Sequence, residues 1–437
     1  MEALTIFILA MSFFLLIGVG MPVAWSIAIS SLLTLLISLP SLAALTTIAQ
    51  RMGTGLDSFT LLAIPFFILS GQLMTHGGIA QRLIRFAKSL IGTLPGGLAL
   101  INIISAMMMG AIAGSAMASA SAMGGILGPE MEKEGYDKEY GAAVNITSST
   151  MGLVIPPSNV LIVYSLASGG VSIAALFLAG YIPGILTCLF LMLVASIWAK
   201  SKGYPISERS SIREVFSSFI SAFPSLLLLF IIIGGIVAGF FTATEASAIA
   251  VLYTLILGFL YKEIKFKDLS KIFLDSSKTS AIVLLLIACS MSMSWVMSYE
   301  NIPQNLSDFL IGISENKIVI LLMINLILLF VGIFMDMTPA VLIFTPIFLP
   351  VVKSIGIDPI QFGIIMVLNL CIGLCTPPVG SVLFVGVGIA KTSIEKVIKP
   401  LLPLFIAMIF ALGLITCLLY TSPSPRDATL SRMPSSA

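Results

Sequence analysis

The chain has 437 residues, of which 58% are hydrophobic and 10% are charged, with a net charge of +2 and a mean hydropathy of +1.12. Soluble domains carry about 25% charged residues, so this composition excludes an ordinary soluble globule and a disordered chain. The small net charge excludes a nucleic-acid-binding protein, because it provides no basic surface for polyanions. What remains is an all-helical protein that crosses a lipid bilayer many times, with about 20 apolar residues per crossing.

Apolar stretches separated by short polar segments predict the membrane helices. In chain order they cover residues 4–39, 60–74, 98–127, 142–167, 173–199, 223–261, 281–297, 318–352, 362–390 and 401–416. Glycine and proline interrupt four of them, near residues 114–115, 152–157, 338–339 and 373–378. Inside a bilayer a broken backbone is tolerated only where protein or a polar cavity satisfies it, so these breaks indicate the functional site.

The interruptions recur at a constant offset of 221 residues (135 to 356). This offset relates the Gly-Tyr-Asp tripeptide 135–137 to Gly-Ile-Asp 356–358, and the proline pair 156–157 to 377–378. A gapless register that contains a proline pair indicates two homologous halves. We expect these halves to be residues 1–203 and 204–416.

Basic residues cluster in four segments, which the positive-inside rule places in the cytoplasm. These clusters contain Arg82, Arg85 and Lys88; Lys200, Lys202, Arg209 and Arg213; Lys262, Lys265, Lys267 and Lys271; and Lys391, Lys396 and Lys399. Counting from a periplasmic N-terminus gives five crossings per half, if 98–127 and 318–352 are re-entrant hairpins. Because five is odd, the second half is inverted. The prediction is ten full crossings, two hairpins, and broken helices at about 136–168 and 358–390.

The breaks in the first half carry oxygen ligands. The first hairpin turns at Ala113-Gly114-Ser115, and the break after Gly152 leads into Pro156-Pro157. Proline has no amide donor and disfavours helix before it, which leaves carbonyls of about 152–155 free for a hard cation such as Na⁺. A half-helix that begins near Ser158 suits a substrate carboxylate. The alternative is a small-residue packing face with a proline kink.

The second half repeats this design and adds an acidic residue. Asp336 precedes Met337-Thr338-Pro339 at a predicted membrane depth, where an ionisable residue indicates function. Alternatively, Asp336 caps the following half-helix close to water. Glu245 presents the same choice, since Thr244 could cap the next helix with Glu245 in its first turn.

The sequence lacks the residues that several kinds of functional site require. The only histidine is His76, so a histidine-based triad or metal cluster is excluded. The five cysteines lie in or beside apolar runs, which is typical of packing residues rather than of a disulfide framework. There is no GxxxxGK[ST] phosphate loop for ATP hydrolysis. We therefore expect no enzyme, no organic cofactor, and transport driven by an ion gradient.

Six motifs together resemble one known family. They are Leu62-Ala63-Ile64-Pro65-Phe66-Phe67, Gly77-Gly78-Ile79-Ala80-Gln81-Arg82-Leu83, Leu94-Pro95-Gly96-Gly97, Ile155-Pro156-Pro157-Ser158, Thr242-Ala243-Thr244-Glu245-Ala246 and Gly332-Ile333-Phe334-Met335-Asp336. Over residues 1–416 the chain resembles the large membrane subunit of tripartite ATP-independent periplasmic (TRAP) transporters. One position departs from the family pattern: Ala113 stands where a serine is common, so a hydroxyl ligand is missing there.

The resemblance implies Na⁺-driven, elevator-type import of a carboxylate such as a C4-dicarboxylate or sialic acid. It also implies a location in the bacterial inner membrane, a small four-helix membrane subunit, and a periplasmic binding protein that delivers the substrate. The alternatives are a related Na⁺-coupled carboxylate transporter that needs no binding protein, and a membrane-embedded enzyme. Only Asp336 and Glu245 stand out as candidate catalytic residues for such an enzyme, and they lie in different segments.

The expected site residues follow from the breaks and the resemblance together. For Na⁺ we expect Ser115, Gly152, Ile155 and Pro157 in the first half, and Gly332, Thr338, Gly373, Thr376 and Pro378 in the second. For the substrate we expect Ser149, Asn159 and Asp336, between the two hairpin tips.

The C-terminal segment differs from the rest of the chain. Residues 417–437 are polar and rich in serine and proline after their first few positions. When these residues are back-translated with suitable codons, the DNA sequence matches consecutive segments of a sequencing adapter. We therefore expect read-through here rather than native sequence, the alternative being a natural disordered tail.

Overall fold

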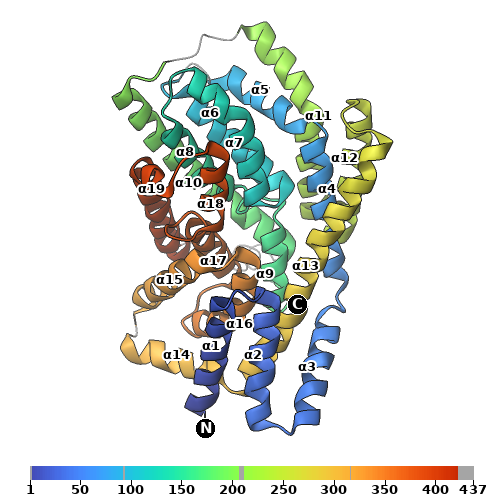
Figure 1. Ribbon diagram of the computed structural model, residues 1–437, viewed down its shortest axis with the longest axis vertical. Coiled ribbons are helices and arrows are strands. Elements are labelled where there is room, and N and C mark those ends of the chain that lie inside the picture. Colours follow the sequence, from blue (N-terminus) through green and yellow to red (C-terminus); the bar gives the residue numbers. More distant parts are fainter. Residues whose placement is uncertain (1, 92–93, 206–210, 315, 422–437) are drawn as a thin grey trace, which may run out of the picture.

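The computed structural model describes residues 2–91, 94–205, 211–314 and 316–421, and these residues form helices without strands (Figure 1). The all-helical prediction is confirmed. The helices are α1 (Glu2–Gly18), α2 (Val23–Ser38), α3 (Ser41–Gly55), η1 (Phe59–Leu62), α4 (Ala63–His76), α5 (Ile79–Ile91), α6 (Gly97–Ala113), α7 (Ala116–Lys133), α8 (Lys138–Met151), α9 (Asn159–Ala167), α10 (Ile173–Lys202), α11 (Ile212–Val237), α12 (Ala243–Leu260), α13 (Phe266–Tyr299), α14 (Ile302–Ile313), α15 (Lys317–Phe334), α16 (Met337–Ser354), α17 (Pro359–Gly373), α18 (Ser381–Ala390) and α19 (Ile394–Thr421).

Eight helical segments of the described residues are long and apolar enough to cross a membrane. They are Phe59–His76, Ile173–Lys202, Ile212–Val237, Ala243–Leu260, Phe266–Tyr299, Lys317–Phe334, Met337–Ser354 and Ile394–Cys417. Five further apolar helices are shorter, among them α17 and α18, which are the two pieces of one interrupted segment. The chain is therefore a multi-pass membrane protein.

Three helices differ from the sequence prediction, one in its existence and two in where they end. Helix α3 was not expected, because its sequence mixes polar and apolar residues; it packs against α2 and α13. Helix α7 runs to Lys133 rather than ending near residue 127, and it carries Pro129 inside. Helix α19 continues to Thr421, and residues 422–437 of the expected adapter segment lie outside the described residues.

Each half contains a helical hairpin with a tight tip. In hairpin one, α6 ends at Gly114, which takes a left-handed φ of +62°, and Ser115 caps α7 by accepting a hydrogen bond from the Ala118 N–H at 3.3 Å. A left-handed φ favours glycine, because it has no Cβ. In hairpin two, α15 and α16 are joined by Met335 and Asp336 in extended conformations.

A broken helix lies beside each hairpin. The first consists of α8 and α9, separated by residues 152–158, and the second consists of α17 and α18, separated by residues 374–380. The Pro156–Pro157 and Pro377–Pro378 peptide bonds, at matching positions of the two breaks, are both cis.

Glycine pairs bring each hairpin against its own broken helix. A Cβ on Gly152 would lie 2.4 Å from the Gly110 Cα, and a Cβ on Gly373 would lie 2.6 Å from the Gly332 Cα. Real Cβ atoms do not come this close to backbone atoms, so only glycine permits both crossings. A glycine contact of the same kind thus occurs once in residues 1–203 and once in residues 204–416, and the internal repeat stays a prediction.

The two halves are interlocked. Helix α9 packs on α16 and α17, with the Tyr164 ring over Gly363, while α18 packs on α7 and α8, with Gly386 against Ile146. Between the halves, the Cys371 thiol donates to the Thr150 carbonyl at 3.2 Å, and these two residues are themselves 221 positions apart. Each broken helix is thus held by the other half's hairpin.

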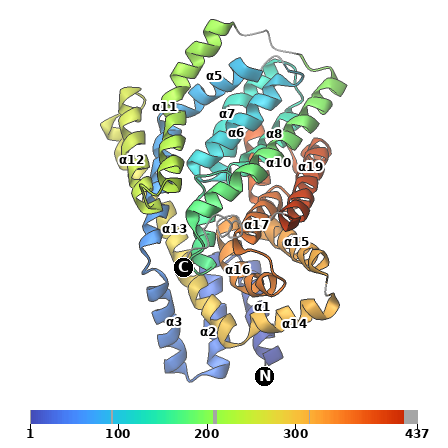
Figure 2. The ribbon, with the colours of Figure 1, turned by 180° about the vertical axis from the view of Figure 1, so that it is seen from behind.

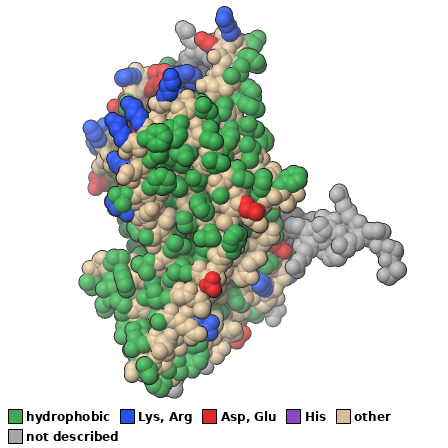
Figure 3. Space-filling view, turned by 90° about the vertical axis from the view of Figure 1, so that its right-hand side faces the viewer, with side chains coloured by type: hydrophobic (Ala, Val, Ile, Leu, Met, Phe, Trp, Pro, Cys, Tyr) green, Lys and Arg blue, Asp and Glu red, His purple; other side chains and the backbone are tan. Residues whose placement is uncertain are grey.

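The remaining helices flank this interlocked body (Figure 1 and, from behind, Figure 2). Helix α4 packs on α12, α13 and α6, α5 packs on α11 and α6, and α14 packs on α16. Most of the Lys and Arg side chains visible in Figure 3 gather at the upper end, above a broad apolar surface. This charge asymmetry is what the positive-inside rule requires of a membrane protein.

Candidate functional site

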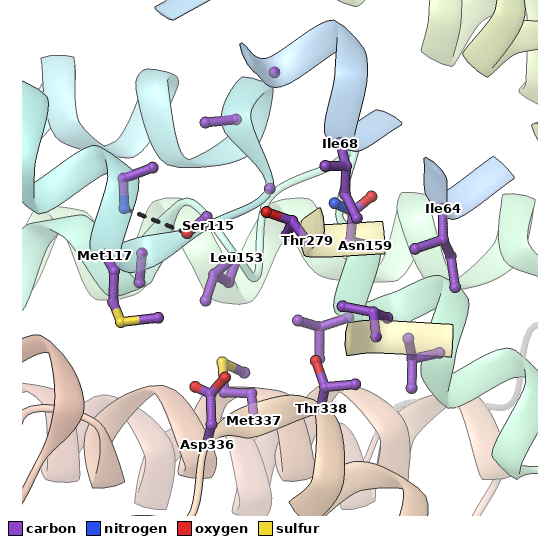
Figure 4. Close-up of a pocket in the computed structure, with 18 of the residues that line it drawn as sticks. Ile64, Ile68, Ser115, Met117, Leu153, Asn159, Thr279, Asp336, Met337 and Thr338 are labelled. Atoms are coloured by element: carbon purple, nitrogen blue, oxygen red, sulfur yellow. Dashed lines mark hydrogen bonds between the residues drawn. The ribbon is translucent and has the colours of Figure 1, made fainter. Parts of the chain in front are cut away.

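The two hairpin tips face each other across a cavity of about 300 Å³. Hairpin one contributes residues 113–118, hairpin two contributes residues 336–338, and the start of α9 contributes Asn159. Figure 4 shows Ser115 and Asn159 on the upper wall, with Asp336 and Thr338 on the lower wall. The structure therefore brings together four of the site residues that the sequence indicated.

The upper wall combines a hairpin tip with a helix N-terminus. The Ser158 hydroxyl accepts a hydrogen bond from the Leu161 N–H and donates one to the Leu153 carbonyl, so it caps α9 and closes the break before it. A Cβ on Gly114 would lie 2.4 Å from the Asn159 Nδ2, so the tip and the α9 start are in direct contact. A helix N-terminus carries a partial positive charge that suits an anion.

The lower wall carries a carboxylate without a capping role. Asp336 occupies the N-cap position of α16, but its side chain makes no capping hydrogen bond. The residue is exposed at the cavity surface. Of the two alternatives for Asp336, the capping one lacks its hydrogen bond. The carboxylate interacts with the backbone N–H of Met337 at the edge of the cavity.

Two unexpected elements complete the cavity. Helix α4 contributes Gln72 and Thr75, and helix α13 contributes Thr279. The Thr75 and Thr279 hydroxyls also donate to the Gly71 and Asp275 carbonyls one turn earlier, at 2.9 and 3.0 Å. Because these polar residues lie within unbroken helices, no local pattern in the sequence marks them.

The other expected residues lie behind the tips and do not line this cavity. Gly152, Gly332 and Gly373 form the two glycine contacts, and the Ile155 side chain packs where a Cβ on Gly184 would be 2.4 Å away. Pro157 and Pro378 follow the two cis bonds. These positions could reach an ion only through backbone carbonyls at the rear of each tip.

Two hydroxyls in this rear region already donate to the backbone. The buried Ser149 hydroxyl donates to the Asn145 carbonyl at 2.7 Å, and the Thr376 hydroxyl donates to the Ile372 carbonyl at 2.8 Å. A hydroxyl that donates in this way still has lone pairs for a cation. In the second break, the Gly373 carbonyl accepts a hydrogen bond from the Thr376 N–H at 2.9 Å. An ion bound to this oxygen would share it with that hydrogen bond.

Comparison with known protein families shows which family the chain belongs to. The family model described as "Tripartite ATP-independent periplasmic transporter, DctM component" matches residues 10–420. The chain belongs to this family. It is 58% identical over 410 residues to the protein YgiK of Salmonella typhimurium, with 94% of each chain covered. It is 38% identical over 401 residues to the sialic acid TRAP transporter large permease protein SiaM of Vibrio cholerae, with 92% of this chain and 93% of the relative covered.

Solved structures support the fold of this TRAP large permease subunit. The crystal structure of the YdaH transporter from Alcanivorax borkumensis matches with a TM-score of 0.67 and 14% identity, and covers 87% of this chain and 89% of that one. At this identity the likeness concerns the fold alone. The family model and the relative from Vibrio cholerae are both described as TRAP transporter components.

In the TRAP subunit, Glu245 has a structural role, but its partner differs from the expected one. Thr242, not Thr244, caps α12: the Glu245 N–H donates to the Thr242 hydroxyl at 3.3 Å, and the Glu245 carboxylate accepts the Thr242 N–H at 2.8 Å. This reciprocal pair is a capping box. Thr244 instead donates to the Phe59 carbonyl at 3.1 Å, which ties α12 to η1.

Proposed function

We propose that this TRAP large subunit imports a carboxylate-bearing solute, such as a C4-dicarboxylate or sialic acid, driven by the Na⁺ gradient. A periplasmic binding protein would deliver the solute, and a small four-helix subunit would complete the transporter in the bacterial inner membrane. The observation that carries this proposal is the cavity between the hairpin tips, with the α9 N-terminus on one wall and Asp336 on the other.

The two walls suggest how Na⁺ and the solute would be coupled. The α9 N-terminus attracts a carboxylate, whereas the Asp336 carboxylate repels it across a cavity of about 300 Å³. A cation beside Asp336 would cancel this repulsion. Hydroxyls of Ser115 and Thr338, on the same two tips, are hard oxygen ligands for that cation. The solute then binds well only after the ion does.

The packing supports movement of the site as one body. The glycine contacts hold each hairpin to its broken helix, and the interlocking of α9 and α18 with the opposite hairpins joins the halves. We propose that this body slides past a scaffold of α1, α2, α11 and α12, with α5 and α14 as connecting arms. A rigid body that carries both hairpin tips and Asn159 is what an elevator mechanism requires, while α4 and α13 complete the cavity from outside this body.

Uptake by the complete assembly tests this function. The chain is reconstituted with its small subunit in proteoliposomes, and a radiolabelled dicarboxylate or sialic acid is added with the matching binding protein. Uptake is expected only with an inward Na⁺ gradient, and not with K⁺ or choline. Uptake that proceeds equally in choline would contradict Na⁺ coupling.

The main alternative is a Na⁺-coupled carboxylate transporter that works without a binding protein. The same proteoliposomes discriminate the two, because uptake of free solute at an undiminished rate without any binding protein would favour the alternative. The family membership favours the tripartite assembly.

A further inference from the structure

An ion pair joins helix α5 to hairpin one. The Lys88 ammonium on α5 contacts the Glu130 carboxylate on α7. The other ion pairs between described residues do not involve α5. Because α7 belongs to the interlocked body and α5 leads into it, this pair links a connecting arm to the part of the molecule that carries the tip cavity.

Helix α5 is fastened at its start to the end of α12. The Arg82 guanidinium lies over the Tyr261 ring, 3.6 Å from the ring centroid, and donates to the Gly78 carbonyl at 2.8 Å. The face of an aromatic ring attracts a cation at this distance. A Cβ on Gly78 would lie 2.9 Å from the Glu263 Cγ, so the turn before α5 also contacts the segment after α12. The motif at residues 77–83 therefore anchors α5 to α12.

Further contacts fasten the same helix to α11. The Ser89 and Ser218 hydroxyls lie 2.7 Å apart, and the Phe86 and Phe219 rings pack with their centroids 5.6 Å apart. Helices α11 and α12 both belong to the proposed scaffold. Helix α5 also packs on α6 of the body, but its ion pair with the body is the one at Lys88. The start and the end of α5 are thus both tied to the scaffold.

The ion pair can bias a movement and still break. The Lys88 and Glu130 side chains are 40% and 35% exposed, so water competes for both charges. An ion pair of this exposure shifts a two-state equilibrium by about threefold. Glu214 lines the same cavity as Lys88, but its carboxylate accepts the Ser211 N–H at 2.8 Å within the cap of α11. Among the described residues, the ion-pair partner of Lys88 is Glu130.

We propose that the Lys88–Glu130 pair is a latch that holds the interlocked body in the position seen in this structure. The latch rests on the proposed function, because it acts on the sliding movement of the body. When the body moves along the scaffold, Glu130 moves with α7 while Lys88 stays with α5, so the ion pair must break. The attraction between the two charges therefore favours the observed position over the other one.

Charge reversal distinguishes a latch from a separate effect of either residue. Lys88→Glu and Glu130→Lys each replace an attraction with a repulsion, whereas the double variant restores an ion pair with the charges exchanged. Glu132→Lys is the matched control. Glu132 also lies on α7 and forms an ion pair, but its partner is Lys138 on α8, at 3.9 Å and within the body.

The position of the body is measured by double electron–electron resonance on the full chain in lipid nanodiscs. Spin labels are attached at Gly234→Cys on α11 and at Gly388→Cys on α18, where a Cβ meets no atom within 4 Å. Cys417→Ser removes the exposed cysteine, and the other four cysteines are buried. The Na⁺ concentration is kept constant while the KCl concentration is varied.

In the parent chain we expect one main distance between the labels, that of this structure. Each single reversal should raise the ratio of a second distance to the first about tenfold, because the lost attraction and the new repulsion each contribute about threefold. The double reversal and Glu132→Lys should keep the parent ratio. Added KCl should raise the ratio in the parent and lower it in the single variants, since salt screens attraction and repulsion alike. The salt series on the parent tests the latch even if a single variant does not fold.

Three results would overturn the proposal. Two distances in the same ratio in every variant would show that the body moves without a latch at this pair. A double reversal that is shifted as far as the single variants would show that the two residues act separately. A single distance in every variant and at every KCl concentration would contradict the sliding movement itself, and thus the proposed elevator mechanism as well as the latch.

Discussion

At the scale of single residues, two aspartates at helix starts have different roles. Asp358 caps α17 by accepting the Ile360 N–H at 2.7 Å, whereas Asp336 starts α16 without such a bond. A capping carboxylate stabilises its helix, while an ionisable residue inside a membrane protein that does not cap a helix costs free energy and indicates function. Sequence position alone does not distinguish the two, because both precede a helix with proline in its first turn.

Substitution of each aspartate separates these roles. Asp336→Asn is expected to lower Na⁺-driven uptake by about tenfold or more, the factor expected for one hydrogen bond to a charged group, and to leave the melting temperature unchanged or higher. Asp358→Ala should lower the free energy of unfolding by about 1 kcal/mol. Uptake assays and thermal unfolding measure both effects. A large loss of stability in Asp336→Asn would instead indicate a structural role.

At the scale of helices, glycine contacts determine where the hairpins and broken helices cross. Gly110 meets Gly152, and Gly332 meets Gly373, at the ends of the helices where the chain breaks. The breaks themselves follow from proline chemistry and were predicted from the sequence. The partners of the glycines were not, because a glycine in an apolar run is compatible with packing, a bend or open space.

Adding one methyl group to these crossings tests their importance. Gly152→Ala and Gly373→Ala are each expected to lower the free energy of unfolding by about 1–3 kcal/mol, because the new Cβ would meet backbone that cannot move aside. Gly234→Ala is the control, since a Cβ there meets nothing within 4 Å. Thermal unfolding in detergent gives the comparison. Equal stability of all three variants would show that the helices shift freely.

At the scale of the whole molecule, the site exists only because the two halves interlock. Ser115 and Thr338 come from hairpins far apart in the sequence and meet across one cavity. A cation bound between them would bridge the halves. It should therefore stabilise the folded chain by mass action, because the unfolded chain does not hold the two tips together.

The expected effect of removing Na⁺ follows from this linkage. Replacing Na⁺ with choline at constant ionic strength should lower the free energy of unfolding, by about 2.7 kcal/mol if Na⁺ was present at a hundred times its Kd. In a Ser115→Ala/Thr338→Ala double variant the difference between the two salts should shrink. Measuring the difference removes the separate cost of losing the Ser115 cap on α7. An unchanged difference in the double variant would exclude these tips as the Na⁺ site.

The sequence by itself determined the class of fold, the proline and glycine breaks, and the family. These features depend on hydropathy and on local backbone chemistry, which act between near neighbours in the chain. The capping of α12 by Thr242 is also local, because Thr242 and Glu245 have the spacing of a capping box. Only the tertiary structure decided that Asp336 and Thr338 lie across one cavity from Ser115, and that Gln72 and Thr279 line it. Each of these depends on which helices pack together, and contacts between residues far apart in the chain leave no periodic pattern in it.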